Sequence, residues 1–219
     1  MKKYLFIPVV LLLLALGACS EDEETTKPSL KITGSDGTEV ALNGTWERCL
    51  VETMDDGSQE AWKESVTLNG ESMTFSNLFY LSSVCSGIAI FDFKGSATIT
   101  LLDTTVEAEL KGQTVTANKA DLDFTAASIL PYFKDAADYL NGLGEDPALC
   151  GITEYSANKE TSLPLDCDEL GFSDMEKGLI YVDNSGASAV MFQSDGSPTS
   201  PKDDSGYPLA LDGDGYTKQ

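Results

Sequence analysis

The strongest constraint on the fold is a two-residue alternation of apolar and polar residues that runs from Leu42 to Phe124. Successive side chains of a β-strand point to opposite faces, so such alternation is typical of strands with one buried face. Turn-forming pairs at Asn69-Gly70 and Lys111-Gly112 separate neighbouring runs and favour hairpins. The pattern predicts a mainly β, antiparallel fold. The predicted strands are Thr45 to Thr53, Ala61 to Leu68, Ser72 to Leu81, Gly87 to Phe93, Ser96 to Leu102, Val106 to Leu110, Thr114 to Phe124, Gly178 to Asp183 and Ala187 to Gln193.

One segment departs from this alternation. Between Ser128 and Leu140 the apolar residues recur at three- and four-residue spacing, and Asn141-Gly142 follows as a stop signal. This spacing predicts one amphipathic helix near residues 128–141, with its apolar stripe against the sheet. The irregular C-terminal tail, residues 194–219, is rich in Asp, Gly, Ser and Pro, and we expect its apolar residues to pack back on the body.

The N-terminus has the features of an export signal. Two lysines precede an uncharged apolar run from Tyr4 to Leu16, which is shorter than the roughly 20 residues that span a bilayer as a helix. The sequence Leu16-Gly17-Ala18-Cys19 resembles the lipobox of bacterial lipoproteins. This resemblance implies a signal peptide at residues 1–18 and lipid attachment, such as palmitate, at Cys19. The alternative is an ordinary signal peptide with a chance cysteine.

An acidic run, Glu21-Asp22-Glu23-Glu24, follows the cysteine. Adjacent carboxylates repel one another and stay solvated, so residues 19–40 are expected to form an acidic flexible tether before a single domain at residues 41–219. A cysteine and serine followed by acids also resemble the signal that sends some Gram-negative lipoproteins to the cell surface. The expected location is therefore the outer membrane, with the protein lipid-anchored and displayed on the surface; an anchor facing the periplasm is the alternative.

The composition excludes several function classes. The chain has 36 acidic and 14 basic residues, a net charge of −22, a single arginine (Arg48) and no histidine. Nucleic-acid binding is excluded because no positive surface is available to contact a run of phosphates. Without histidine there is no Ser-His or Cys-His catalysis and no imidazole ligand for zinc. We expect no enzyme activity, no cofactor and no metal, and we interpret the Asp121/Asp123 pair and Asp212-Gly213-Asp214 as solvated acidic residues.

Four cysteines remain for the fold besides Cys19: Cys49, Cys85, Cys150 and Cys167. An even number of cysteines in an exported chain predicts two disulfides, and three pairings are open. The order along the chain and the predicted strands favour Cys49 with Cys85 and Cys150 with Cys167. A zinc site of four thiolates is the alternative, but the C-x₂-C spacing typical of such sites does not occur.

A longer motif carries a family resemblance. Gly44-Thr45-Trp46 is followed by Cys49, by Thr74-Phe75, by the aromatic pair Phe79-Tyr80, by Cys85 and by Gly95. This pattern resembles the lipocalin-like adenomatosis-polyposis-coli-down-regulated domain and its bacterial lipoprotein relatives. The resemblance implies an up-and-down barrel of about eight to nine strands and a disulfide between the two cysteines of the motif.

Classical lipocalins place a late arginine across the tryptophan, and this chain has no arginine after Arg48. Lys218 or Arg48 itself is the candidate cation at that position.

A barrel of this size either fills with side chains or encloses one small ligand. Apolar residues on the predicted strands are candidates for the interior: Trp46, Phe75, Phe79, Phe91, Phe93, Tyr181 and Phe192. One interpretation makes them a filled core, and the other makes them the wall of a cavity for a small apolar or amphipathic ligand. A further alternative is a non-catalytic accessory or adhesion module that docks onto another envelope protein or a glycan through its acidic loops.

The lipid anchor gives a direct prediction. We expect Cys19→Ser to abolish membrane association, because each buried methylene of an acyl chain contributes about 0.8 kcal/mol to anchoring. Fractionation and intact mass measure this outcome. Recovery of the unchanged protein with a free Cys19 thiol in the membrane fraction would contradict it.

Overall fold

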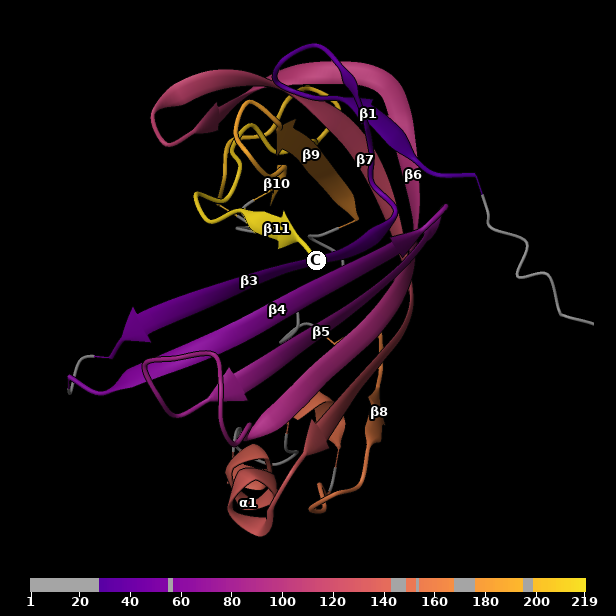
Figure 1. The fold of residues 1–219 in the computed structure, drawn as a ribbon. Coiled ribbons are helices and arrows are strands. Elements are labelled where there is room, and N and C mark those ends of the chain that lie inside the picture. Colours follow the sequence, from indigo (N-terminus) through magenta and orange to yellow (C-terminus); the bar gives the residue numbers. More distant parts are fainter. Residues whose placement is uncertain (1–27, 55–56, 143–148, 153, 168–175, 195–198) are drawn as a thin grey trace, which may run out of the picture.

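The computed structural model describes residues 28–54, 57–142, 149–152, 154–167, 176–194 and 199–219. The predicted signal peptide and Cys19 lie outside the described residues. Within them, antiparallel strands dominate and one α-helix lies at one end (Figure 1). The elements are β1 (Lys31–Thr33), β2 (Glu39–Ala41), β3 (Gly44–Thr53), β4 (Gln59–Asn69), β5 (Ser72–Tyr80), β6 (Phe91–Leu110), β7 (Gln113–Pro131), α1 (Lys134–Gly142), a 3₁₀ turn (Leu149–Gly151), β8 (Thr161–Leu163), β9 (Lys177–Asp183), β10 (Val190–Gln193) and β11 (Tyr216–Lys218).

Nine of these strands form one sheet whose strands close into a ring. The order is β6-β5-β4-β3-β11-β10-β9-β7-β8, and β6 also pairs with β7, which completes the ring and leaves β8 attached to the outside of the circuit. The pairings between these strands are antiparallel. The mainly β, antiparallel prediction is confirmed. Closure turns one face of the sheet toward the inside of the ring.

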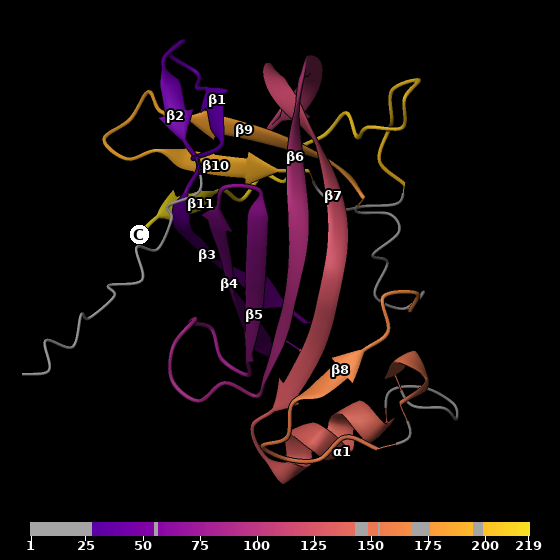
Figure 2. The ribbon, with the colours of Figure 1, turned by 90° about the vertical axis from the view of Figure 1, so that its right-hand side faces the viewer.

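The long hairpin of β6 and β7 holds the two halves of the ring together. These strands have 20 and 19 residues. The part near α1 pairs with β5 and β8, and the part farther along pairs with β9. Figure 2 shows both strands bowed along the height of the molecule. Register shifts at Ser96/Ala97 and at Leu101/Thr105 mark bulges, which bend a strand without ending it.

The three short strands predicted between residues 87 and 110 are therefore one continuous strand, and residues 87–90 precede it. At Leu101/Thr105 the extra residues lie in β6 and interrupt its alternation, whereas at Ser96/Ala97 the extra residue, Thr125, lies in β7.

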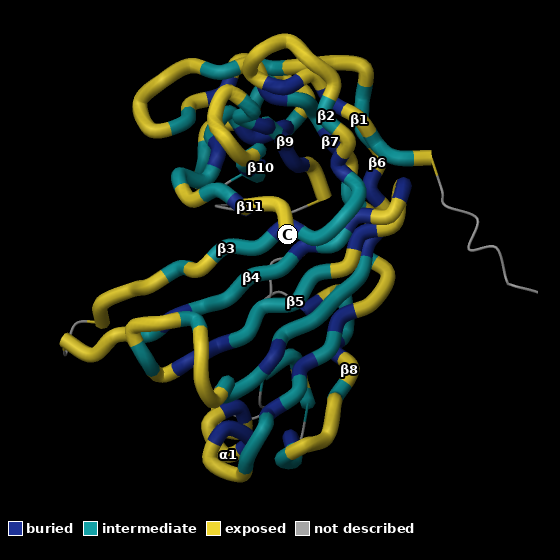
Figure 3. The backbone as a smooth tube through the Cα atoms, in the orientation of Figure 1, coloured by how far each residue is buried: buried dark blue, intermediate teal, exposed yellow. Residues whose placement is uncertain are grey.

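Buried side chains form three clusters, and exposed residues gather at the turns between strands (Figure 3). The first cluster lies inside the ring around the fully buried Trp46. The second lies between α1 and the adjoining ends of β6 and β7. The third lies on the opposite face of β9 and β10, where Tyr207 and Leu211 of the C-terminal tail cover it. The expectation that the tail packs back on the body is confirmed.

Both disulfides have the favoured pairing. Cys49 on β3 is bonded to Cys85 with a Cα–Cα distance of 5.8 Å, and Cys150 is bonded to Cys167 with a Cα–Cα distance of 5.2 Å. The first bond ties the loop after β5 to the outer end of β3. The second closes the segment that lies beside α1.

Two boundaries differ from the sequence prediction. The tether was expected to reach residue 40, but β1 and β2 pair as a hairpin and Ile32 packs in the central cluster, so the ordered fold begins earlier. The helix begins at Lys134 and not at Ser128. Residues 127–131 belong to β7, because Ile129 is paired with β6 on one side and β8 on the other, and this pairing overrides the local helical spacing.

No helix within the described part of the chain is both long and apolar enough to cross a membrane.

Gly95 shows how tightly the inner face is packed. It lies directly across from Phe75 in the β5–β6 pair. A Cβ atom added to Gly95 would lie 2.2 Å from Cζ of Phe75 and 2.9 Å from the carbonyl oxygen of Ala126. The glycine therefore lets the phenyl ring lie over the neighbouring strand.

We expect Gly95→Ala to lower the free energy of unfolding by about 1–3 kcal/mol, because the added methyl group forces the Phe75 ring and the backbone of β7 to move. Urea denaturation measures this change. Gly186→Ala is the matched control, since the nearest atom to its added Cβ is 3.9 Å away. Equal stability of the two variants would contradict the packing argument.

Candidate functional site

A cavity of about 280 Å³ lies inside the ring. Its wall comes from strands on both halves of the ring and from the segment that precedes β11. The lining residues are Arg48, Glu64, Ser65, Val66, Met73, Phe75, Ser76, Asn77, Phe93, Leu122, Phe124, Gln193, Ser194, Asp212 and Tyr216. Its surface is mostly apolar, with a group of polar side chains at one end.

The polar end is built by strand register. Arg48 of β3 is paired with Glu64 of β4, Glu64 with Asn77 of β5, and Asn77 with Phe93 of β6. Residues directly opposite one another in neighbouring strands share a face, so these four side chains form one row across the sheet. The apolar neighbours of the row lie two residues along each strand, where Val66 pairs with Phe75.

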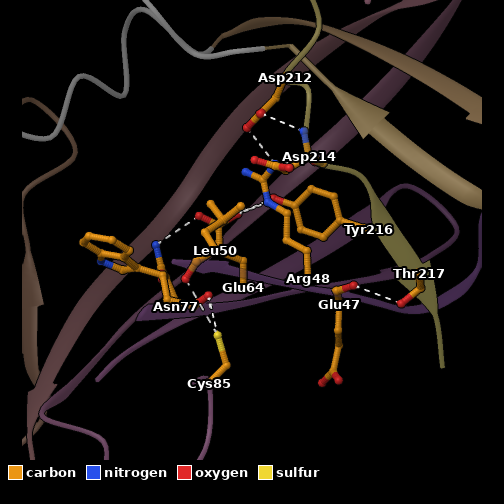
Figure 4. A network of polar contacts seen from close by, with 11 residues as sticks. Glu47, Arg48, Leu50, Glu64, Asn77, Cys85, Asp212, Asp214, Tyr216 and Thr217 are labelled. Atoms are coloured by element: carbon orange, nitrogen blue, oxygen red, sulfur yellow. Dashed lines mark hydrogen bonds and ion pairs between the residues drawn. The ribbon is translucent and has the colours of Figure 1, made fainter. Parts of the chain in front are cut away.

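Arg48 connects this row to the C-terminal segment (Figure 4). Its Nε donates to Oε2 of Glu64 at 2.6 Å, and its Nη1 donates to Oδ2 of Asp212 at 2.6 Å and to the carbonyl oxygen of Asp214 at 2.6 Å. Its guanidinium carbon lies 4.3 Å from the centre of the Tyr216 ring. The arginine is thus held by charge, hydrogen bonds and an aromatic face at once.

Burial and charge set the protonation of this group. Burial opposes the charge on Arg48, but Tyr216, Glu64 and Asp212 outweigh it and raise the pKa of the guanidinium. Burial, and then the Glu64 carboxylate, raise the pKa of the Tyr216 phenol. The phenol therefore stays neutral at physiological pH and donates to Oε2 of Glu64 at 2.6 Å.

Two acceptor atoms at the polar end have no close hydrogen-bond donor. Oε1 of Glu64 receives one long contact, 3.5 Å from Nδ2 of Asn77. Oδ1 of Asn77 is buried and accepts no hydrogen bond within the described part of the chain. Exchanging the two amide atoms would turn the oxygen toward the Glu64 carboxylate, so the orientation is fixed by repulsion. A buried acceptor without a donor is costly, and a bound molecule that donates a hydrogen bond would relieve that cost.

Phenylalanine rings form much of the apolar wall. The ring centre of Phe75 lies 5.8 Å from that of Phe93 and 6.1 Å from that of Phe124, the latter edge-to-face. Because these rings are tilted relative to one another, some of them present a face and others an edge along the wall.

Of the predicted interior residues, Phe75 and Phe93 line the cavity, and the other five do not. Trp46 fills the centre of the ring beside the cavity, and Nζ of Lys218 lies 5.3 Å from its ring centre, so the late lysine takes the place over the tryptophan. Phe79 and Phe91 stack at 4.8 Å between ring centres, toward the outer ends of their strands.

Tyr181 and Phe192 lie in the third cluster, on the opposite face of β9 and β10 from Val182 and Met191. The prediction that Tyr181 and Phe192 face the inside of the ring is therefore wrong. Both faces of these two strands are buried, so apolar character did not distinguish the inside from the outside.

The acidic candidates differ in their surroundings, and the interpretation of Asp212 as a solvated residue is wrong. Asp212 is occupied by Arg48, and Asp121 accepts a hydrogen bond from the Tyr207 hydroxyl. Asp123 is exposed. The described residues include no group of three or more cysteine and acidic side chains placed to hold a metal ion.

The polar end was missed by the sequence analysis. Glu64, Asn77, Asp212 and Tyr216 were not among the predicted site residues. One signal was present: Arg48 follows Trp46 by two residues, which places the chain's single arginine on the same inward face as the buried tryptophan.

No family model matches the chain, and no similar sequence was found among curated proteins.

The raised tyrosine pKa values predict a loss of stability in alkali. An unfolded tyrosine ionises near pH 10, whereas buried Tyr216 keeps its proton and burial raises the pKa of Tyr207 to about 12. Stability is fully present below pH 10 and falls as the pH rises above it, because only the unfolded state releases these protons.

We expect Tyr216→Phe to make this fall less steep in urea unfolding measured between pH 8 and 11. Tyr139→Phe is the control, because Tyr139 is exposed and should leave the slope unchanged. An unaltered slope in Tyr216→Phe would contradict the assignment.

Proposed function

We propose that this protein is a lipid-anchored lipoprotein of the Gram-negative outer membrane, displayed at the cell surface, whose lipocalin-like barrel binds a small apolar or amphipathic ligand. The observation that carries the binding proposal is the cavity of about 280 Å³ inside the ring of strands. A filled core would have favoured a purely structural role for the interior. Small-molecule sites are concave, mostly apolar and supplied with a few convergent polar groups, and this cavity has each of those properties.

The size of the cavity limits the ligand. Its volume of about 280 Å³ lies just below the roughly 300–1,000 Å³ that small-molecule sites occupy, so a compact molecule or one short alkyl chain fits better than a whole phospholipid. Binding is favoured by burial of the ligand's apolar surface at about 25 cal/mol per Å².

The anchor would keep this cavity close to a membrane. Twelve peptide units separate Cys19 from Lys31 at the start of β1, and they can span at most about 40 Å. A ligand that leaves or enters a lipid surface would then be captured nearby. Docking onto another envelope protein or a glycan through acidic loops stays a prediction.

Cavity filling tests the proposal. We expect Leu122→Phe to weaken binding of a neutral naphthyl dye, N-phenyl-1-naphthylamine, at least tenfold, because Leu122 lines the cavity and the larger ring occupies its volume. Dye fluorescence measures the affinity.

Leu81→Phe makes the same chemical change at a side chain that is 65% exposed, and it should leave the affinity unchanged. Equal affinity of the two variants, with both folded by circular dichroism, would place the dye outside the ring and remove the proposal.

A further inference from the structure

We propose that the cavity selects an organic cation: an amphipathic amine whose ammonium group lies at Glu64 and Asn77 and whose apolar body lies against the phenylalanine wall. This inference rests on the proposed function, since it names the ligand class of the same cavity. Three independent properties of the lining residues lead to it.

The first property is charge. Among the ionised residues that line the cavity, Arg48 is positive, and Glu64 and Asp212 are negative, which sums to one negative charge. Arg48 is already bonded to both carboxylates at 2.6 Å. A cationic ligand would balance the remaining negative charge, whereas a carboxylate ligand would lie beside two like charges.

The second property is the inventory of hydrogen-bonding atoms. Three donors at the polar end are engaged: Nε and Nη1 of Arg48 and the hydroxyl of Tyr216 each donate to an oxygen of the protein. The underused atoms are acceptors: Oδ1 of Asn77 and Oε1 of Glu64. A ligand that donates complements them, and an ammonium group carries three donors and no acceptor.

The third property is the aromatic wall. Phe75 lies between Phe93 and Phe124; Phe93 is in the same inner-face row as Glu64, and Phe75 is in the next row. The faces of phenyl rings attract cations and also provide apolar contact for an alkyl or aryl body. One wall therefore serves both parts of an amphipathic amine.

The charge of the whole protein acts in the same direction. With a net charge of −22, the chain attracts cations and repels anions over distances longer than direct contact at low salt. An anionic lipid fragment would meet repulsion both during approach and inside the cavity.

Three probes of equal chain length separate the ligand classes: octylammonium, octanol and octanoate. Isothermal titration calorimetry of the whole protein at pH 7.5 and low salt measures each affinity. We expect octylammonium to bind at least tenfold more tightly than octanol, and octanoate to bind most weakly.

Variants assign this preference to the polar end. Glu64→Gln should bring the affinity for octylammonium close to that for octanol. Because Glu64 also pairs with Arg48, Asn77→Leu is the second variant; it removes the unpaired acceptor and should weaken octylammonium binding while leaving octanol binding intact. Glu47→Gln is the matched control, since Glu47 precedes Arg48 on the opposite face of β3 and pairs with Lys63.

The outcomes distinguish this inference from the proposed function. Octanol or octanoate binding as tightly as octylammonium would overturn the cation preference and leave a cavity for neutral or acidic ligands. A cation preference lost equally in Glu47→Gln would assign it to overall charge and overturn the site. No binding of any probe at millimolar concentration would remove both proposals.

Discussion

The fold depends on one buried ion-pair network centred on Arg48. This arginine on β3 bonds to Glu64 on β4 and to Asp212, which lies 164 residues later in the chain. Removing one member of such a network leaves an uncompensated charge in a partly buried place, which typically costs about 3–5 kcal/mol. The network therefore fixes where the C-terminal segment docks, and that docking puts β11 between β3 and β10. The same three residues line the polar end of the cavity.

The network also determines what the cavity can bind. A lone arginine in an apolar pocket would attract acids, but here the guanidinium charge is already neutralised by Glu64 and Asp212. The acceptors without a close donor are Oδ1 of Asn77 and Oε1 of Glu64, and beside them lies an aromatic wall that includes Phe75. Gly95 contributes to this wall indirectly, because the absence of a side chain there lets Phe75 lie across the neighbouring strand. Gly95 thus shapes the aromatic wall of the cavity, and the Arg48 network shapes its polar end.

Much of the sheet could be predicted from local alternation, while the site could not. The strands around Trp46, Val66 and Met73 were found because one face of each is buried and the pattern has a period of two. Alternation says which residues share a face, but it does not say which distant strand covers that face. The pairing of Arg48 with Asp212, and the placement of Tyr181 outside the ring, depend on contacts between segments far apart in the chain. The prediction that the helix begins at Ser128 was wrong for the same reason, because Ile129 pairs with two strands, β6 and β8.

The position of β11 has a consequence for the order of assembly. The hairpins from β3 to β7 connect neighbours in sequence, so they can form as soon as that part of the chain is available. The last gap between β3 and β10 is filled only by residues 216–218, which follow everything else in the ring. Until these residues pair, the ring is open between β3 and β10, and Trp46 lacks the cover of Lys218. Tryptophan burial should then be the slowest step of refolding, and it should coincide with arrival of the C-terminal strand.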